Sequence, residues 1–160
     1  FYRLIRKHWR GPDAGRRVWH NHCYMYVLKP GRLVVDRTHQ VSPLRPADAA
    51  VIARSWPYGR SPDHVLGRIL SGPGCCIRHN GALAAWALTH DDGSMGFLHV
   101  VEKYRGRGMA RTLTTALAER MLLLGIQPFV YILATNKASI RLTAGMGFSR
   151  AGRFSWFATS

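Results

Sequence analysis

One short segment of the chain combines glycine, arginine and a helix start in a way that can bind an anion. Arg105-Gly106-Arg107-Gly108-Met109-Ala110 stands where a predicted strand gives way to a predicted helix. The first amide groups of a helix have no partner inside the helix, and the helix dipole makes them electropositive. Glycine lets the backbone approach a ligand closely, and Arg105, Arg107 and Arg111 add positive charge. The segment predicts a binding site for a pyrophosphate. The alternative interpretation is a solvated basic turn closed by glycine, with no ligand.

Two familiar phosphate-binding motifs do not fit this segment. A P-loop ends in Gly-Lys-Ser/Thr, and no such sequence follows Arg107. A dinucleotide-binding fold has another glycine spacing and parallel strands, whereas the strands predicted before Arg105 are antiparallel. A different kind of anion site is therefore indicated.

The elements that would position the segment follow from turn residues and hydrophobic periodicity. Asn80-Gly81 and Asp91-Asp92-Gly93 predict tight turns between three strands, and Leu113, Leu117 and Met121 recur at helical spacing. The predicted strands and helices, in chain order from Val41, are Val41–Leu44, Pro46–Ser55, a helix from Ser61 to the Gly72 break, Cys75–His79, Ala82–Thr89, Met95–Val101, Met109–Leu124, Pro128–Ala134, Asn136–Met146 and Phe148–Phe157. This order predicts an α/β fold (mixed α+β) with an antiparallel front and one crossover helix.

Composition limits the class of protein. The 160 residues predict a single domain or one domain with a short extra segment, and 47% hydrophobic residues are enough for a core. The longest apolar runs, such as Ala82–Leu88, are far shorter than the roughly 20 residues of a membrane span. Three cysteines do not make a disulfide scaffold, and the adjacent Cys75 and Cys76 are expected on a strand with one facing in and one facing out. A reducing, intracellular location, cytoplasmic or mitochondrial, is expected.

Residues 1–37 form a basic segment with its own character. The first 40 residues hold nine cations and two acids, within a net charge of +15 for the chain. Cys23–Leu28 and Arg32–Asp36 predict a hairpin around Lys29-Pro30-Gly31. Arginines beside aromatic residues such as Trp9 could bind nucleic acid, but the edge of a divided domain is the favoured interpretation. We expect no nucleic-acid partner.

A metal site is not predicted. His20-x-His22-Cys23 could begin one, but no second pair of ligands stands at a recognisable spacing.

Two stretches resemble the GNAT acyltransferase superfamily. Val100–Gly108 and the helix after it resemble its coenzyme-A-binding motif, and Asn136–Leu142 with Met146-Gly147-Phe148 resembles its second motif. The resemblance spans about Val41–Trp156, and the order of elements agrees along it.

Within that superfamily, the chain is most similar to the C-terminal domain of glycine N-acyltransferase-like proteins. The run from Gly125 to Val130, then Gly147-Phe148 and Ser155-Trp156-Phe157, carries this similarity. Since a related amino-terminal half precedes the domain in those proteins, residues 1–37 would be a remnant of it. Residues 38–160 would be the GNAT-like acyltransferase domain.

The resemblance also implies roles for individual residues. Backbone groups of Val100 and Val101 would pair with the pantetheine arm, amides from Arg105 to Ala110 would hold the pyrophosphate, and Asn136 and Ser139 would reach the pantetheine or a phosphate. The full implied set is Val100, Val101, Arg105, Gly106, Arg107, Gly108, Met109, Ala110, Arg111, Asn136 and Ser139. A neutral amine would attack an acyl thioester through an oxyanion that a strand amide can stabilise.

The expected acid and base are both missing. Glycine N-acyltransferases resemble this chain with a glutamate where Ser94 stands, and many superfamily members have a tyrosine where Thr143 stands. His99 has a suitable ordinary pKa for a base. Leu98 and Val100 should share one strand face and His99 the other, unless a bulge resets the alternation.

Taken together, the sequence predicts an acyl-CoA-dependent N-acyltransferase. The acyl group, acetyl or longer, would pass from coenzyme A to a small amine such as glycine, with His99 and Ser94 as catalytic candidates and no metal. The alternatives are a protein or peptide N-acetyltransferase and a coenzyme-A-binding module without catalysis.

Overall fold

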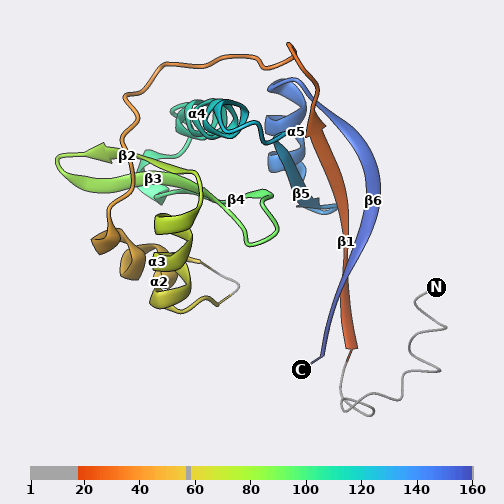
Figure 1. Ribbon diagram of the computed structural model, residues 1–160, viewed down its shortest axis with the longest axis horizontal. Coiled ribbons are helices and arrows are strands. Elements are labelled where there is room, and N and C mark those ends of the chain that lie inside the picture. Colours follow the sequence, from red (N-terminus) through yellow and green to blue (C-terminus); the bar gives the residue numbers. More distant parts are fainter. Residues whose placement is uncertain (1–17, 57–58, 160) are drawn as a thin grey trace.

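A computed structural model describes residues 18–56 and 59–159, with side chains over 21–56 and 59–155. Trp9 and the rest of the first 17 residues lie outside the described residues. The described strands form two antiparallel sheets (Figure 1). The first has the order β2 (Gly74–His79), β3 (Ala82–Thr89) and β4 (Met95–Val100), and the second has the order β5 (Phe129–Leu133), β1 (Val18–Leu28) and β6 (Phe148–Thr159).

Helices cover both faces of the first sheet. One face carries α4 (Met109–Leu123), and the other carries a short 3-10 turn (Pro46–Asp48) with α2 (Ala49–Ser55) and α3 (Pro62–Ser71) (Figure 1). α5 (Lys137–Gly145) leads into β6. None of the described helices is long and apolar enough to span a bilayer.

The predicted order of elements is confirmed, and local signals set the boundaries. Ser61 caps α3 by accepting a hydrogen bond from the His64 amide at 3.1 Å, and Pro62 takes the first helical position. The predicted strand Val41–Leu44 is reduced to one antiparallel bridge between Ser42 and Cys76.

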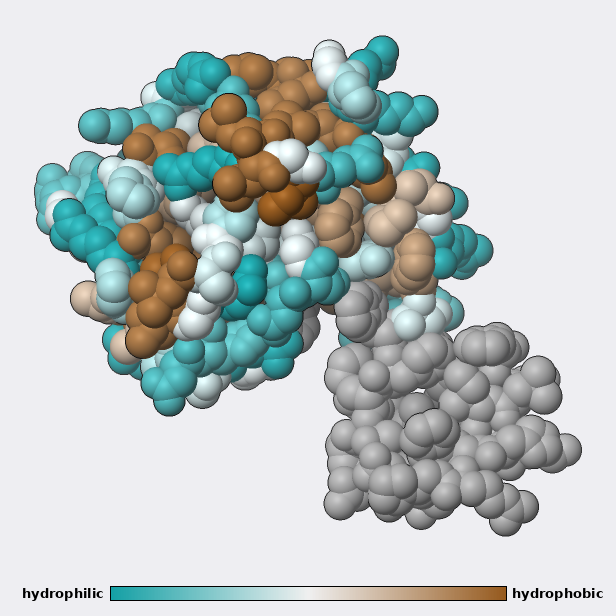
Figure 2. Space-filling model, viewed as in Figure 1, coloured by the Kyte–Doolittle hydropathy of each residue, from teal (hydrophilic) through white to brown (hydrophobic). Residues whose placement is uncertain are grey.

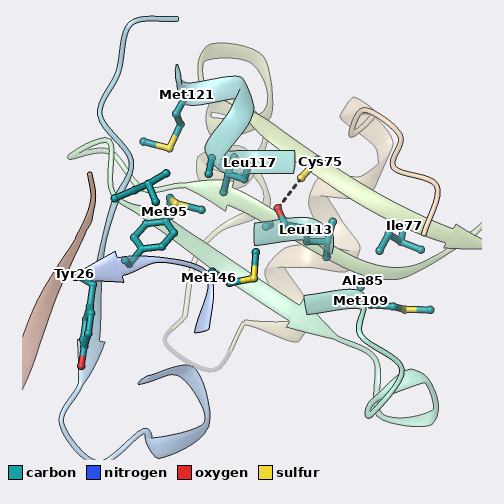
Figure 3. Close-up of a cluster of buried hydrophobic side chains, with 14 of the residues drawn as sticks. Tyr26, Cys75, Ile77, Ala85, Met95, Met109, Leu113, Leu117, Met121 and Met146 are labelled. Carbon is teal, nitrogen blue, oxygen red and sulfur yellow. Dashed lines mark hydrogen bonds between the residues drawn. The ribbon is translucent and has the colours of Figure 1, made fainter. Parts of the chain in front are cut away.

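The larger core lies between α4, the first sheet and the second sheet. Leu113, Leu117 and Met121 of α4 are at most 1% exposed, which confirms the periodic face predicted for this helix. Met146, just after α5, joins the same cluster (Figure 3), and the Cys75 thiol contacts the Leu113 carbonyl oxygen at 3.8 Å.

The smaller core lies beneath α2 and α3. Ile52 and Val65 meet Trp86 and Phe97 of the sheet there, all at most 1% exposed. Cys76 belongs to this core while Cys75 belongs to the larger one. The two thiols therefore point to opposite faces as predicted, but both are buried because helices cover both faces.

The end of α4 is apolar and exposed. The predicted helix runs to Leu124, but α4 ends at Leu123 and Leu124 is 64% exposed. Leu122 and Leu123 are 47% and 86% exposed. Figure 2 shows a hydrophobic area over the part of this face that α4 occupies.

The predicted hairpin of Cys23–Leu28 with Arg32–Asp36 is wrong. β1 forms, but β5 pairs with one of its edges and β6 with the other, so no edge remains for Arg32–Asp36. β1 is thus the central strand of a sheet completed by residues 129–159. A boundary at residue 37 would cut through that sheet, and the origin of residues 1–37 in a preceding domain stays a prediction.

After β1, residues 32–44 form a connection, here called the strap, that crosses α4 on its way to α2 (Figure 1). Asp36 accepts a hydrogen bond from the Thr112 hydroxyl at 2.6 Å, which lowers the pKa of the Asp36 carboxyl, and its amide donates to Thr115 Oγ1 at 2.9 Å. Arg37 forms a two-pronged ion pair with Glu119. The strap is therefore fastened along α4.

Candidate functional site

The structure places the predicted anion-binding segment at the N-terminus of α4. Gly106 and Gly108 have φ values of +75° and +83°, which lie in the left-handed region where glycine is favoured. Gly108 is the N-cap, and its carbonyl oxygen accepts from the Arg111 amide at 2.9 Å. Met109 is buried and fixes the start of the helix to the larger core.

Five backbone amides of this segment have no hydrogen-bond acceptor in the described part of the chain. They are the N–H groups of Gly106, Arg107, Gly108, Met109 and Ala110. The last two belong to the first turn of α4, where the helix supplies no acceptor. The segment thus offers a row of donors at the positive end of a 15-residue helix.

Arginine and lysine side chains surround these amides. Arg105 donates from Nε to the Val100 carbonyl oxygen at 3.2 Å, which holds it against the end of β4. The guanidinium of Arg107 and the ammonium of Lys103 lie 5.7 and 5.0 Å from the centre of the Tyr104 ring. Such an arrangement favours a ligand with several negative charges.

Arg111 is partly engaged elsewhere. Its Nε lies 3.5 Å from Asp36 Oδ2, and its side chain is 42% exposed. This ion pair ties the first turn of α4 to the strap and leaves Arg111 less free for a ligand than Arg105 or Arg107.

β4 contains a bulge that sets the direction of His99. Leu88 pairs with Gly96 whereas Trp86 pairs with His99, so β4 has one residue more than β3 over this stretch. Phe97 adopts φ +47° at the bulge and is fully buried. The bulge lies before Leu98, so Leu98 and Val100 still share one face of β4 and His99 takes the other, as predicted.

Because of the bulge, His99 faces the smaller core. Its ring stacks on Trp86 with centroids 4.6 Å apart, while Leu98 and Val100 pack on the α4 side. Burial, and then the charge of Arg105, lowers the pKa of His99 below its ordinary value. A half-buried, neutral imidazole one residue before Val100 can accept a proton.

The backbone of Val100 and Val101 is used unequally. The Val101 amide donates to the Ala84 carbonyl oxygen at 2.9 Å, and its carbonyl oxygen accepts from the Tyr104 amide at 2.8 Å. Since backbone groups alternate along an antiparallel strand, the polar groups of Val100 point to the other edge of β4. That edge faces β5, which contacts β4 without a hydrogen-bonded ladder among the described residues. Val100 is thus the better placed of the two for a pantetheine arm.

Ser94 lies apart from the other predicted residues. It sits in the turn before β4, is 2% exposed, and donates from its hydroxyl to Asp92 Oδ1 at 2.6 Å. Its amide donates to the same oxygen at 2.9 Å. The residue completes a turn, and β4 separates it from the anion-binding segment by roughly 20 Å of chain.

Asn136 and Ser139 lie at the N-terminus of α5. The side-chain oxygen of Asn136 accepts from the Ser139 amide at 3.0 Å and so caps that helix. Asn136 is itself exposed. Thr143, at the position compared with a tyrosine, is 6% exposed.

The three cysteines of the chain are buried thiols. Burial raises the pKa of the Cys75 thiol to about 12 and raises those of Cys23 and Cys76 as well. Protonated thiols of this kind are poor nucleophiles. Among the described residues, no group of three or more His, Cys, Asp or Glu side chains is arranged to hold a metal.

Sequence reasoning missed Trp86 and the strap. Trp86 is set against His99 by the register of β3 and β4, which the bulge shifts by one residue. No residue type in the sequence marks that shift, because Phe97 is neither glycine nor asparagine. Within the strap, the sequence predicts Arg32–Asp36 as half of a hairpin and Val41–Leu44 as a strand, and neither prediction brings His39 to the start of α4.

One protein family and several solved structures match this chain. The family described as FR47-like protein matches residues 73–157, just over half of the chain. A Drosophila melanogaster protein superposes with a TM-score of 0.79 at 25% identity, covering 90% of this chain. Among curated proteins, no sequence matches.

Two bacterial structures show the same fold. A protein described as a GNAT-family acetyltransferase from Novosphingobium aromaticivorans has a TM-score of 0.74 at 21% identity and 91% coverage of this chain. A GNAT-family acetyltransferase from Colwellia psychrerythraea has a TM-score of 0.70 at 17% identity and 90% coverage. This chain spans 52%, 68% and 57% of the Drosophila, Novosphingobium and Colwellia proteins.

The matched range contains β4, the anion-binding segment and α5, and the fold is that of the GNAT acetyltransferases. The chain belongs to the FR47-like family.

Proposed function

We propose that the chain is an acyl-CoA-dependent N-acyltransferase. In this proposal the segment Arg105–Ala110 binds the pyrophosphate of coenzyme A, and the acyl group passes to the amine of a small acceptor. The observation that carries the proposal is the row of unengaged amides at the start of α4, which includes two left-handed glycines and is flanked by arginines. The fold shared with GNAT acetyltransferases supports the same ligand.

Each part of the site has a role in the proposed reaction. Acyl-CoA supplies a thioester that a neutral amine attacks at the carbonyl carbon, and the carbon–sulfur bond then breaks to release the thiolate. His99, with its lowered pKa, takes the proton that the amine loses. The amide of Val100, on the open edge of β4, is the candidate donor to the oxyanion.

The acceptor is proposed from the resemblance to glycine N-acyltransferase-like proteins. That resemblance favours glycine or another small amino acid over a protein amine. A second candidate, a coenzyme-A-binding module without catalysis, is favoured by one observation. Ser94 is engaged in its turn and Thr143 is buried, so neither supplies the acid or base of related enzymes.

A turnover panel separates these functions. The chain is incubated with acetyl-CoA and longer acyl-CoA thioesters against glycine, other amino acids and short peptides, and release of free thiol is measured. Turnover with glycine or another small amine supports the proposal, and turnover with peptides alone transfers it to a peptide acceptor. A rise in melting temperature with coenzyme A but no turnover indicates the binding module. If the chain shows no turnover and no rise in melting temperature with coenzyme A, the proposal is contradicted.

A further inference from the structure

We propose that His39 is a positioning residue that orients the anion-binding segment through the Arg107 carbonyl group. The inference rests on the proposed function, because it concerns the binding of coenzyme A at that segment. His39 lies on the strap, 68 residues away in sequence, and its Nε2 is 2.6 Å from the Arg107 carbonyl oxygen. Nothing in the GNAT-like motif draws attention to this residue.

The direction of this hydrogen bond is fixed by chemistry. A carbonyl oxygen only accepts, so Nε2 of His39 must carry the proton. The Arg107 carbonyl and the Gly108 N–H belong to one trans peptide unit and point in opposite directions. By holding the carbonyl toward the strap, His39 turns the Gly108 N–H away from the strap, toward the open side of the segment.

This peptide needs an external restraint. The Arg107–Gly108 peptide rotates about ψ of Arg107 and φ of Gly108, and glycine moves between left-handed and right-handed conformations at little cost. A rotation of the Arg107–Gly108 peptide would replace a donor with a carbonyl oxygen, which repels a phosphate. Pre-ordering the donor before the ligand arrives raises affinity, because less conformational freedom is lost on binding.

The strap holds His39 in place from both sides. Three residues before it, Asp36 is bound to Thr112 and Thr115 of α4. Three residues after it, Ser42 exchanges two backbone hydrogen bonds with Cys76 of β2, at 2.8 and 2.9 Å. His39 is therefore midway between two fixed points, above the first turn of α4.

The test compares three variants of the chain. His39→Ala removes the donor, and His39→Gln keeps an N–H at a similar reach. Arg37→Ala loosens the strap by removing its ion pair with Glu119, without touching the segment. We measure Kd for coenzyme A by calorimetry, KM and kcat for acetyl-CoA, and the melting temperature.

We expect His39→Ala to raise Kd and KM about three- to tenfold, the range of one lost hydrogen bond, with kcat within about twofold of the parent. His39→Gln should recover most of the affinity, and Arg37→Ala should bind like the parent chain.

Three results would overturn the inference. If the parent binds coenzyme A and His39→Ala binds equally well, the restraint is not needed. If Arg37→Ala weakens binding as much as His39→Ala, the effect belongs to the strap as a whole. If His39→Gln is as weak as His39→Ala at an equal melting temperature, the donated hydrogen bond is not the cause. A parent chain that does not bind coenzyme A instead removes the proposed function, and the inference with it.

Discussion

The two halves of the candidate site lie side by side along the chain but are built from different material. The segment Arg105–Ala110 offers a ligand backbone N–H groups and a helix dipole, with two glycines in the left-handed region. The neighbouring stretch of β4 acts through one side chain, His99, aimed by a bulge and stacked on Trp86. Binding at Arg105–Ala110 would need few particular side chains, whereas proton transfer at β4 would depend on His99 alone.

The difference predicts how the two halves respond to substitution. A site made of backbone donors should keep its function as long as its glycines and its helix start are kept. A role that depends on one side chain is lost when that side chain changes, and Ser94, the other catalytic candidate in the sequence, completes a turn. Substitutions should therefore separate ligand binding from turnover.

Among these substitutions, Gly108→Val should weaken coenzyme A binding the most. A β-branched residue at φ +83° is strained, and the segment must shift or the helix start must unwind. With two or three charge-assisted hydrogen bonds lost, affinity for coenzyme A should fall at least about 100-fold. Calorimetric titration measures this loss.

Gly125→Val is the matched control for that change. Gly125 has φ +72° at the opposite end of α4, and a Cβ there would meet nothing within 4 Å. The strain is similar, so the unfolding free energy of both variants should fall by about 1–3 kcal/mol. Equal loss of coenzyme A binding in both variants would show that damage to α4, not the segment, is responsible.

His99→Gln should leave coenzyme A binding unchanged and slow turnover about tenfold or more at neutral pH. His90→Gln is the control: burial also lowers the pKa of that imidazole, but it lies against Gly96 at the far end of β4. His90→Gln should keep turnover near that of the parent. A loss of turnover in both variants, or in neither, would remove the catalytic role of His99.

The pH dependence follows from the lowered pKa of His99. The neutral base predominates above that pKa, so turnover should rise with pH through a step below 6.5, and His99→Gln should abolish the step. A further rise on the alkaline side comes from deprotonation of the acceptor amine.

The lowered pKa of His99 also makes stability depend on pH. Because the folded state binds a proton on His99 less readily than the unfolded state does, the stability that His99 contributes is present above its unfolded pKa. That stability is lost as the pH falls through its folded pKa.

Ser94 should give the smallest effect on turnover. Ser94→Ala removes the hydrogen bond to exposed Asp92 and should lower the unfolding free energy by about 1 kcal/mol, with turnover within about twofold of the parent chain.

Ser94→Glu places a carboxylate in a buried position beside Asp92. It should lower the unfolding free energy more than Ser94→Ala does, by about 3 kcal/mol, without a gain in rate. Denaturant unfolding and turnover at pH 7 measure both; a faster Ser94→Glu enzyme would return Ser94 to the role of the missing glutamate.

The sequence predicted most elements because their signals are local. The cap at Ser61, the turn Asn80-Gly81 and the spacing of Leu113 with Leu117 each act over a few residues. The anion-binding segment was found for the same reason, since its glycines and its helix start are contiguous.

The features that were missed depend on contacts between distant residues. Whether Arg32–Asp36 pairs with β1 depends on whether β5 and β6 already occupy its two edges, and these lie over 100 residues away. The bulge at Phe97 depends on the register against β3, and the contact of His39 with Arg107 depends on the path of the strap. No local pattern specifies any of these.

Amide chemical shifts during a titration with coenzyme A test the central claim most directly. In a two-dimensional nitrogen–proton spectrum of the chain, the amides of Gly106, Gly108 and Ala110 should show the largest changes, with proton shifts to lower field as they donate to the pyrophosphate. Gly125, at the other end of α4, should stay unchanged. Saturable binding that leaves Gly106 and Gly108 unshifted, or no binding at all, would contradict the account.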